Sequence, residues 1–273
     1  MIPEERRRQL LAIVTEHGVA TIPQLTEQLG VSHMTVRRDI ALLEQGGRVV
    51  SVSGGIALPS RMVLDASHET KLGLQPIEKR EIAALAAALV EPGELVYLDA
   101  GTTTLALAQR LAETERVDVV TNDLAVAAAA GASASAQVHL LGGRLDAPNQ
   151  ATEGAMAAAA VSQFNIGVAF LSASSFDLRG ISVPTDAKAV LKRAVVDHAE
   201  RVYLLTDSTK YGRVAALRAV ALTEFDGLIT DSRLPETARA HLAELGLELH
   251  VASTPAAEEA AHRAPTTVKG HTA

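Results

Sequence analysis

Residues 21–46 read TIPQLTEQLGVSHMTVRRDIALLEQG and contain two apolar patterns at helical spacing. Leu25 and Leu29 lie four residues apart, so they share one face of a first predicted helix. Gly30 follows as a helix C-cap, and Ser32 is suited to the N-cap of a second helix. The inner face of that second helix is apolar and consists of Val36, Ile40 and Leu43. The pattern predicts two short helices joined by a tight turn.

The start of the second helix carries side chains that this pattern leaves pointing outward. In a helix-turn-helix, the first residues of the second helix reach base edges, while neighbouring Arg and Thr side chains contact phosphates. The candidate DNA-binding residues are therefore Ser32, His33, Met34, Thr35, Arg37 and Arg38. For the two-helix pattern alone, an ordinary helical hairpin with solvated arginines is the alternative.

The flanking sequence favours a complete DNA-binding module. Residues 3–17 form a third amphipathic pattern in front of the two helices. Behind them, Val50 and Val52 alternate with polar residues and are followed by Gly54-Gly55, which predicts a small β-wing. We expect residues 1–58 to form a winged helix-turn-helix that binds double-stranded operator DNA.

Composition narrows the possible classes of protein. The chain has 273 residues, 48% of them hydrophobic and only 3% aromatic, so about two domains with a core of Ala, Val and Leu are expected. The absence of cysteine excludes disulfides and thiolate chemistry and fits a reducing cytoplasm. The N-terminus has no apolar signal core and no run is long enough to span a membrane, so we expect a cytoplasmic protein without a membrane partner.

Charge is distributed unevenly along the chain. The net charge is −7, but the first 60 residues carry six basic and six acidic side chains, so the excess acid lies after residue 60. An acidic chain is a mild argument against nonspecific coating of nucleic acid, because that mode needs a basic field, and it does not exclude sequence-specific binding. Sequence-specific binding would depend on where the arginines stand and on two copies of the module acting together.

After residue 78 the sequence alternates between short apolar runs and helical patterns. We expect residues 59–78 to be a linker, residues 79–252 to be an α/β domain and residues 253–273 to be a disordered tail. The predicted strands are 95–99, 117–121, 138–141, 167–172, 202–206, 227–230 and 247–251. The predicted helices are 79–90, 103–113, 123–130, 153–164, 185–199 and 235–244. This alternation predicts a mostly parallel sheet with helices on both faces.

Small polar residues follow several of the predicted strands. The carboxyl ends of parallel strands meet at one edge of a sheet, where ligands bind. A Gly-Thr-Thr turn running into a helix suits a phosphate, and neighbouring Asp, Asn and Lys side chains suit hydroxyls and charge. The candidate effector-binding residues are Asp99, Gly101, Thr102, Thr103, Thr104, Asn122, Gly142, Gly143, Asp207 and Lys210. Taken singly, a Gly-Thr-Thr turn is more often simple helix capping, Gly-Gly after a strand is usually a turn, and Asp207 and Lys210 could form a surface ion pair. Their repetition at successive strand ends favours a joint site. No metal site and no cofactor is predicted, because the nine histidines are scattered.

Several of these motifs, in this order, resemble the DeoR family of bacterial transcriptional repressors over residues 3 to about 250. The similarity lies in Val31-Ser32, Thr35–Ile40, Glu78–Arg80, Leu98–Thr104, Val120–Asn122, Leu141–Gly143 and Asp207–Gly212. The resemblance implies a winged helix followed by a sensor domain with a fold like ribose-5-phosphate isomerase and CoA transferases. It also implies a homo-oligomer, a dimer or tetramer, controlled by a phosphorylated sugar or a related metabolite. The chain departs from the family's wing pattern, Arg-x-His-Gly-Gly, at Ser51 and Ser53.

The sequence alone leaves two other functions open. One is a sugar-phosphate isomerase with an accessory N-terminal domain, in which Asp99 or Asp207 would act as the general base. The other is a metabolite sensor that has lost strong DNA binding through the serines in its wing. The prediction we favour is a repressor of a carbohydrate operon that is not an enzyme.

Overall fold

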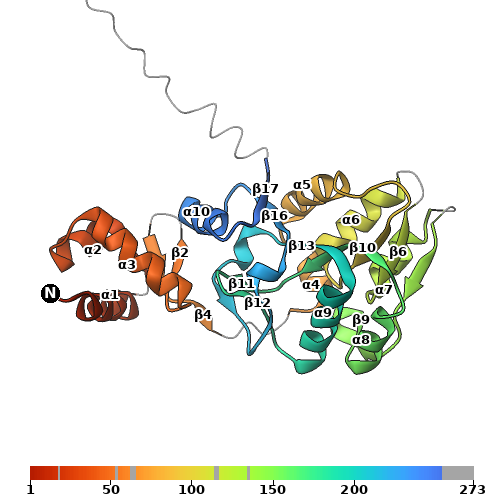
Figure 1. Ribbon diagram of the computed structural model, residues 1–273, viewed down its shortest axis with the longest axis horizontal. Coiled ribbons are helices and arrows are strands. Elements are labelled where there is room, and N and C mark those ends of the chain that lie inside the picture. Colours follow the sequence, from red (N-terminus) through yellow and green to blue (C-terminus); the bar gives the residue numbers. More distant parts are fainter. Residues whose placement is uncertain (18, 53–54, 62–65, 114–116, 134–135, 254–273) are drawn as a thin grey trace, which may run out of the picture.

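The computed structural model describes residues 1–17, 19–52, 55–61, 66–113, 117–133 and 136–253. The molecule is elongated, with a small helical unit at one end and a larger α/β unit forming the rest (Figure 1). The predicted tail lies outside the described residues from position 254 onward, as do Ser53 and Gly54 of the predicted wing.

Three helices and a three-stranded sheet form the N-terminal unit. The helices are α1 (Pro3–His17), α2 (Ile22–Leu29) and α3 (His33–Gln45). The strands β1 (Val19–Thr21), β2 (Val50–Val52) and β3 (Gly55–Ala57) pair antiparallel in the order β1-β3-β2. The winged helix-turn-helix is confirmed, with one addition. The segment between α1 and α2 forms β1, which completes the sheet of the wing.

Local capping signals fix the position of α3 along the chain. The Thr21 hydroxyl accepts the N–H of Gln24 at 3.3 Å, and the Gln24 side chain accepts the N–H of Thr21 at 2.9 Å, which is a capping box. Gly30 ends α2 in the left-handed conformation, at φ +63°. Ser32 then accepts the N–H of Thr35 at 3.3 Å and begins α3. These signals turn one face of α3 inward, where Val36, Ile40 and Leu43 are buried as predicted.

The larger unit is built on seven parallel strands, as the apolar runs predicted. They are β5 (Leu95–Leu98), β6 (Asp118–Thr121), β7 (Val138–Leu140), β10 (Ile166–Ser172), β13 (Ala199–Leu205), β16 (Gly227–Asp231) and β17 (Glu248–Ala252). Their order is β17-β16-β13-β10-β5-β6-β7, and every pairing is parallel. The carboxyl ends of β5, β6, β10 and β13 therefore lie along one edge.

Helices cover both faces of this sheet and bury its two sides separately. On one face, α5 (Pro76–Ala87), α6 (Thr102–Ala112) and α7 (Leu124–Ala130) pack on Val96, Leu98 and Phe170. On the other face, α8 (Ala155–Val161), α9 (Asp186–His198) and α10 (Glu236–Glu244) pack on Tyr97, Leu171 and Leu204. Successive residues of one strand point to opposite faces, so a strand that is apolar along nearly its whole length is buried on both faces of the sheet. The predicted doubly covered α/β sheet is confirmed.

Several short elements stand outside the parallel sheet. They are the hairpin β8 (Arg144–Asp146) and β9 (Ala151–Glu153), the antiparallel strands β11 (Phe176–Asp177), β12 (Gly180–Val183) and β15 (Leu217–Val220), and the 3-10 helices η1 (Ala147–Asn149), η2 (Ser208–Lys210) and η3 (Leu222–Glu224). None of these was predicted, because two to four residues are too few to show a period.

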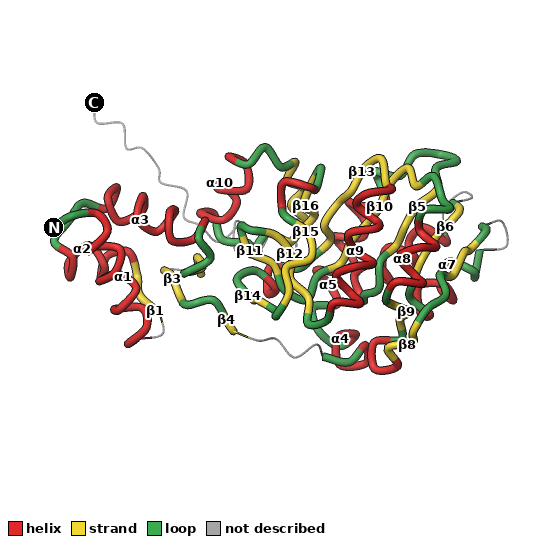
Figure 2. Tube along the Cα trace, turned by 60° about the horizontal axis from the view of Figure 1, so that its bottom comes forward, coloured by secondary structure: helices red, strands yellow, loops and turns green. Residues whose placement is uncertain are grey.

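The predicted linker, residues 59–78, includes elements of secondary structure among its described residues. It contains β4 (Ser60–Arg61), which pairs with β14 (Arg213–Val214), and the short helix α4 (His68–Leu72), which lies below the sheet domain in Figure 2. The helix predicted at 79–90 begins earlier, at Pro76, and ends at Ala87. The reason is that proline fits the first position of a helix, where its missing N–H costs nothing. Pro76 therefore starts a helix and does not close a linker.

Candidate functional site

The predicted DNA-binding edge lies at the exposed start of α3. His33, Met34, Arg37 and Arg38 are exposed, and Met34 keeps 75% of its surface open to solvent. Ser32 and Thr35 are engaged with one another, with 3.0 Å between their hydroxyl oxygens, so both serve the helix cap. An exposed methionine at the tip of a helix is available for apolar contact, and the two arginines are available for base edges or phosphates.

Arg37 has a second environment that the sequence did not suggest. It lines a groove between the N-terminal unit and the sheet domain, together with His33, Arg233, Glu236 and Thr237. The labels in Figure 1 place α10 close to α3 and β2, which agrees with this lining. The recognition helix is thus flanked on one side by the N-terminal turn of α10.

Buried carboxylates hold α3 in place from within. Asp39 is 2% exposed and is paired with Arg6 of α1, whose second nitrogen donates to it at 3.2 Å, and Arg7 lies 3.7 Å away. Glu44 is 1% exposed and accepts the N–H of Ser51 at 2.7 Å and its hydroxyl at 3.1 Å. Ser51, where the family pattern has arginine, therefore faces inward and ties the wing to α3.

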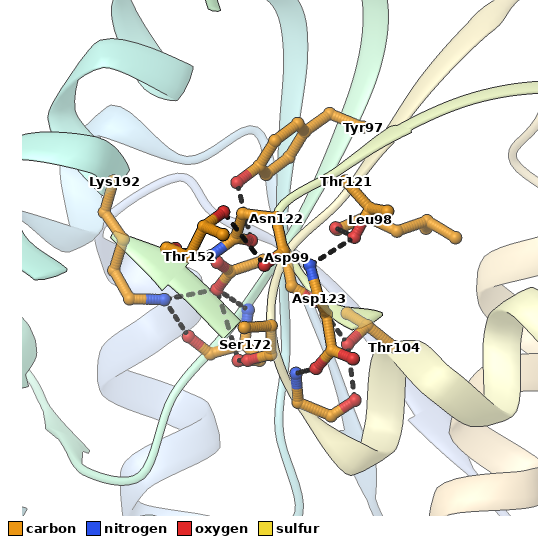
Figure 3. A network of polar contacts seen from close by, with 12 residues as sticks. Tyr97, Leu98, Asp99, Thr104, Thr121, Asn122, Asp123, Thr152, Ser172 and Lys192 are labelled. Carbon is orange, nitrogen blue, oxygen red and sulfur yellow. Dashed lines mark hydrogen bonds and ion pairs between the residues drawn. The ribbon is translucent and has the colours of Figure 1, made fainter. Parts of the chain in front are cut away.

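The end of β5 begins a network of buried polar groups (Figure 3). Asp99 is 2% exposed and is ion-paired with Lys192 of α9. It also accepts the N–H of Ser172 at 2.9 Å and its hydroxyl at 3.2 Å, while Lys192 donates to the Ser172 carbonyl at 2.8 Å. These contacts join the ends of β5 and β10 to a helix on the opposite face. Asp99 and Lys192 both line a cavity.

Asn122 and Asp123, at the end of β6, orient the same network. Asn122 accepts the Tyr97 hydroxyl at 3.1 Å and donates to the Thr152 carbonyl at 2.8 Å, and it too lines the cavity. Asp123 caps α7 and accepts the N–H of Gly101 at 3.1 Å. Burial raises the pKa of Asp123, against the lowering effect of the N–H groups that it accepts.

The Gly-Thr-Thr-Thr turn begins α6, and its residues divide between two tasks. Gly101, Thr102 and Thr103 line a second cavity beside the first, and Gly101 and Thr102 line both. A Cβ atom at Gly101 would stand 2.7 Å from the Ser172 hydroxyl, so only glycine allows this close approach. Thr104 does not line either cavity. Its buried hydroxyl donates to the Asp99 carbonyl at 2.6 Å and to the Gly101 carbonyl at 2.8 Å. Gly142 and Gly143 are likewise absent from the lining of both cavities.

The second cavity is rich in positive charge. Asp207 and Lys210 line it, with 4.0 Å between carboxylate and ammonium, and the other basic residues on it are Lys71, Lys79 and Arg213. Lys79 is 5% exposed and donates to the Lys71 carbonyl at 2.5 Å. Burial, assisted by Lys210 and Lys71 and opposed by Asp207, lowers the pKa of Lys79 to about 8. A bound anion would stabilise the charged form of Lys79, which burial disfavours.

Sequence patterns missed much of this lining. Lys71 lies on α4, inside the predicted linker, and Lys79 belongs to a recognised motif but was not assigned to the site. Lys188 and Lys192 are four residues apart on α9 and both line the first cavity, so the helical spacing of two lysines was an available signal. Glu153, at the end of β9, is 4% exposed and lines the same cavity.

Within the described residues no three or more His, Asp or Glu side chains gather as a metal site would require. No described helix combines the length and apolar character needed to cross a bilayer.

Comparison with known proteins decides the family. The model of the DeoR-like helix-turn-helix domain matches residues 6–62, and that of the DeoR C-terminal sensor domain matches residues 74–232. The chain belongs to the DeoR family. It is therefore a DNA-binding transcriptional regulator, and the resemblance stated from its motifs is confirmed.

Individual relatives of this DeoR-family regulator cover nearly its whole length. It is 45% identical to the uncharacterised HTH-type transcriptional regulator YgbI of Escherichia coli K12, over 92% of this chain and 99% of that one. It is 29% identical to the glycerol-3-phosphate regulon repressor of the same strain, over 90% of this chain and 98% of that one. Among solved structures, ribose 5-phosphate isomerase A of Methanocaldococcus jannaschii is similar over 49% of this chain and 53% of that one, with 16% identity and a TM-score of 0.35.

Proposed function

We propose that this regulator is a repressor of a carbohydrate operon and that a phosphorylated sugar or related metabolite controls it. The observation that carries the proposal is the second cavity, where four basic side chains and a single acidic one surround the N-terminus of α6. The first N–H groups of a helix have no acceptor within the helix and attract anions, and buried cations add to that attraction. A phosphate dianion fits this charge.

The adjoining first cavity would hold the remainder of the effector. It is lined by Asp99, Asn122, Glu153 and Lys192 and shares Gly101 and Thr102 with the phosphate cavity. Carboxylate, amide and ammonium groups are suited to the hydroxyls of a polyol. We therefore assign phosphate binding to Gly101–Thr103, Lys79, Lys210 and Arg213, and leave Thr104, Gly142 and Gly143 out of the site.

On the DNA side, we propose that Arg37 and Arg38 contact operator DNA as part of a cytoplasmic homo-oligomer. Two copies would place two recognition helices on one operator, which compensates for the modest charge of a single module. Effector binding would change operator affinity only if the effector prefers one of two arrangements of the chain.

An isomerase finds less support in the chemistry of the site. The two carboxylates proposed from the sequence as the general base, Asp99 and Asp207, each have a partner in the fold: Asp99 is paired with Lys192, and Asp207 accepts the N–H of Thr209 at 3.1 Å. Proton abstraction by Asp99 would break the ion pair that joins β5 to α9.

Two measurements test the proposal. A thermal-shift screen of the purified protein against phosphorylated sugars and inorganic phosphate should raise the melting temperature, because a ligand that binds only the folded state stabilises it. Unchanged melting with every phosphate ester would refute the effector assignment. Gel-shift titration on the duplex upstream of the protein's own gene tests Arg37→Ala, for which we expect a loss of about 1–3 kcal/mol. Arg110→Ala, which removes the same charge from an exposed position on α6, is the matched control.

A further inference from the structure

Glu153 stands out in the first cavity because one of its two carboxylate oxygens is buried without a partner. Oε1 is paired with Arg144, which is 69% exposed, whereas Oε2 is fully buried and meets no hydrogen-bond donor. Glu153 ends β9 and lines the cavity together with Asp99 and Asn122. A buried acceptor without a donor is costly, and native proteins keep such a group mainly where it has a function.

We propose that Glu153 Oε2 accepts a hydrogen bond from a hydroxyl of the effector and makes the protein select polyol phosphates over plain alkyl phosphates. This inference rests on the proposed function, because it places the hydroxyl-bearing part of the effector beside the phosphate. An ionised carboxylate can only accept hydrogen bonds, so it selects a donor and disfavours an apolar group at the same point. Hydrogen bonds to a charged acceptor are also the stronger kind.

A pair of ligands that differ only in hydroxyl groups tests this role. Calorimetric titration with glycerol 3-phosphate and with n-propyl phosphate should give tighter binding of the former by about 10- to 100-fold in the wild type. Glu153→Gln keeps the shape of the side chain and should remove most of that preference, while the affinity for n-propyl phosphate stays within about twofold. Arg144→Gln, which changes only the exposed partner, should keep the preference.

Stability separates this role from a structural one. If Oε2 serves the ligand, Glu153→Gln leaves the melting temperature of the free protein unchanged or raises it, because a buried charge with one unsatisfied oxygen is removed and the ion pair that is lost is with the exposed Arg144. A lower melting temperature together with an intact preference for glycerol 3-phosphate would overturn the inference. Absence of binding by both esters and by inorganic phosphate would overturn the proposed function, and this inference with it.

A different observation carries a second inference, at the junction between the two domains. Glu44, near the end of the recognition helix, accepts the hydroxyl of Tyr211 at 2.8 Å, and Nδ1 of His241 on α10 lies 3.2 Å from its other oxygen. Since Glu44 also accepts both donors of Ser51, this one buried carboxylate joins α3, β2, the segment after η2 and α10. We call these four residues the Glu44 junction.

The Glu44 junction adjoins the proposed phosphate cavity along the chain. Tyr211 stands between Lys210 and Gly212, with Arg213 next, and both basic residues line that cavity. Gly212 has a φ of +77°, and a Cβ atom there would stand 2.8 Å from Val50 of the wing. The Tyr211 ring packs edge-on against Phe176 at 5.3 Å. A shift of Lys210 toward an anion would therefore move Tyr211, which is packed between the cavity and the wing.

We infer that the Tyr211–Glu44 hydrogen bond transmits occupancy of the phosphate cavity to the recognition helix and the wing. This inference also rests on the proposed function. Coupling between two sites requires an element with contacts to both, and these contacts have to differ between the bound and free states. A phenol donating to a buried carboxylate is such a contact, because it is strong when aligned and is lost with a small displacement.

Hydrogen exchange at the amide of Ser51 reports on the junction directly, since that N–H donates to Glu44. In the wild type, saturating glycerol 3-phosphate should change the exchange rate of the peptide containing Ser51 by at least about twofold. Tyr211→Phe keeps the ring and removes the donor, so it should abolish the ligand-induced change. Its affinity for glycerol 3-phosphate should stay within about twofold of the wild type.

The matched control is Ser208→Ala, which removes another hydroxyl donor of the same segment. The Ser208 hydroxyl donates to Asp231, on β16, at 2.9 Å and not to Glu44, so this variant should respond to the ligand as the wild type does. An equal ligand response in Tyr211→Phe, or no response at Ser51 in a wild type that binds the ligand, would overturn the coupling while leaving the proposed function standing. No binding of glycerol 3-phosphate or inorganic phosphate would overturn both.

Discussion

The affinity for a phosphate ester should fall steeply as the pH rises through 8, because Lys79 loses its proton there. Burial lowers the pKa of Lys79 to about 8, and a bound dianion would raise it again. If only the protonated form binds, the affinity follows the protonated fraction, which is roughly three quarters at pH 7.5 and about one tenth at pH 9. We expect glycerol 3-phosphate to bind roughly eightfold more weakly at pH 9 than at pH 7.5.

The ligand itself does not produce this change. A phosphate ester loses its second proton at about pH 6, so it is a dianion over the whole interval. A lysine with the ordinary pKa of 10.5 would remain almost fully protonated at both pH values, and the affinity would be flat.

Isothermal titration in two buffers of different ionisation enthalpy measures both the affinity and the protons exchanged. At pH 8, binding should take up about half a proton per site. Lys79→Arg keeps the charge and removes the titration, so its affinity should not depend on pH between 7.5 and 9. A flat profile in the wild type, or an equal slope in Lys79→Arg, would refute the assignment of this lysine to the phosphate.

Three further predictions concern stability and the shape of the site. Lys192→Met should lower the free energy of unfolding by about 3–5 kcal/mol in urea titration, because it leaves Asp99 buried without its partner, and adding Asp99→Leu should recover a large part of the loss. Ile40→Ala should lower the unfolding free energy of the N-terminal unit by about 2–5 kcal/mol, since Ile40 is 4% exposed and its loss leaves a cavity. Native-state hydrogen exchange of the intact protein, followed over the described part of residues 1–61, measures this loss. Gly101→Ala should weaken phosphate binding at least about tenfold, because the added methyl group meets Ser172, and Ser172→Gly in the same chain should restore part of that binding.

Elements with a clear period were predictable from the sequence, and the reason is physical. Val36, Ile40 and Leu43 are buried because helical spacing places them on one face, and no distant contact is needed to know it. The parallel strands were likewise found within a few residues, since a strand covered on both faces has to be apolar throughout. Short elements such as α4 and the strands β11 and β12 carry no period, and their positions depend on contacts made elsewhere in the fold.

The site was predictable only in part, because spacing says nothing about partners far away in the chain. The Asp99–Lys192 pair joins residues 93 positions apart, and a lysine on a helix ordinarily lies in solvent. The run Thr102–Thr104 could not reveal which threonine side chains line a cavity. Successive residues on a helix turn by about 100°, so Thr104 points back to the strand end while Thr102 and Thr103 line the cavities. From the sequence, Ser51 was interpreted only as the loss of a wing arginine. Its partner, Glu44, lies on another element and could not be recognised from spacing.

The distribution of buried charge connects these observations. A buried carboxylate or ammonium adds little to stability compared with an apolar side chain of the same size, so its retention calls for another reason. Among the buried charged groups of the described residues, Asp99, Lys79 and Asp207 lie around the ends of β5 and β13, and Glu44 lies beneath the recognition helix. Tyr211 reaches Glu44 from a segment whose neighbours, Lys210 and Arg213, line the proposed phosphate cavity. If these charges served stability alone, apolar replacements at Glu44 and Tyr211 together would leave the ligand's effect on the wing unchanged. If they serve regulation, the doubly substituted protein would still fold, bind phosphate esters and bind DNA. Its affinity for DNA would then be the same with and without the phosphate ester.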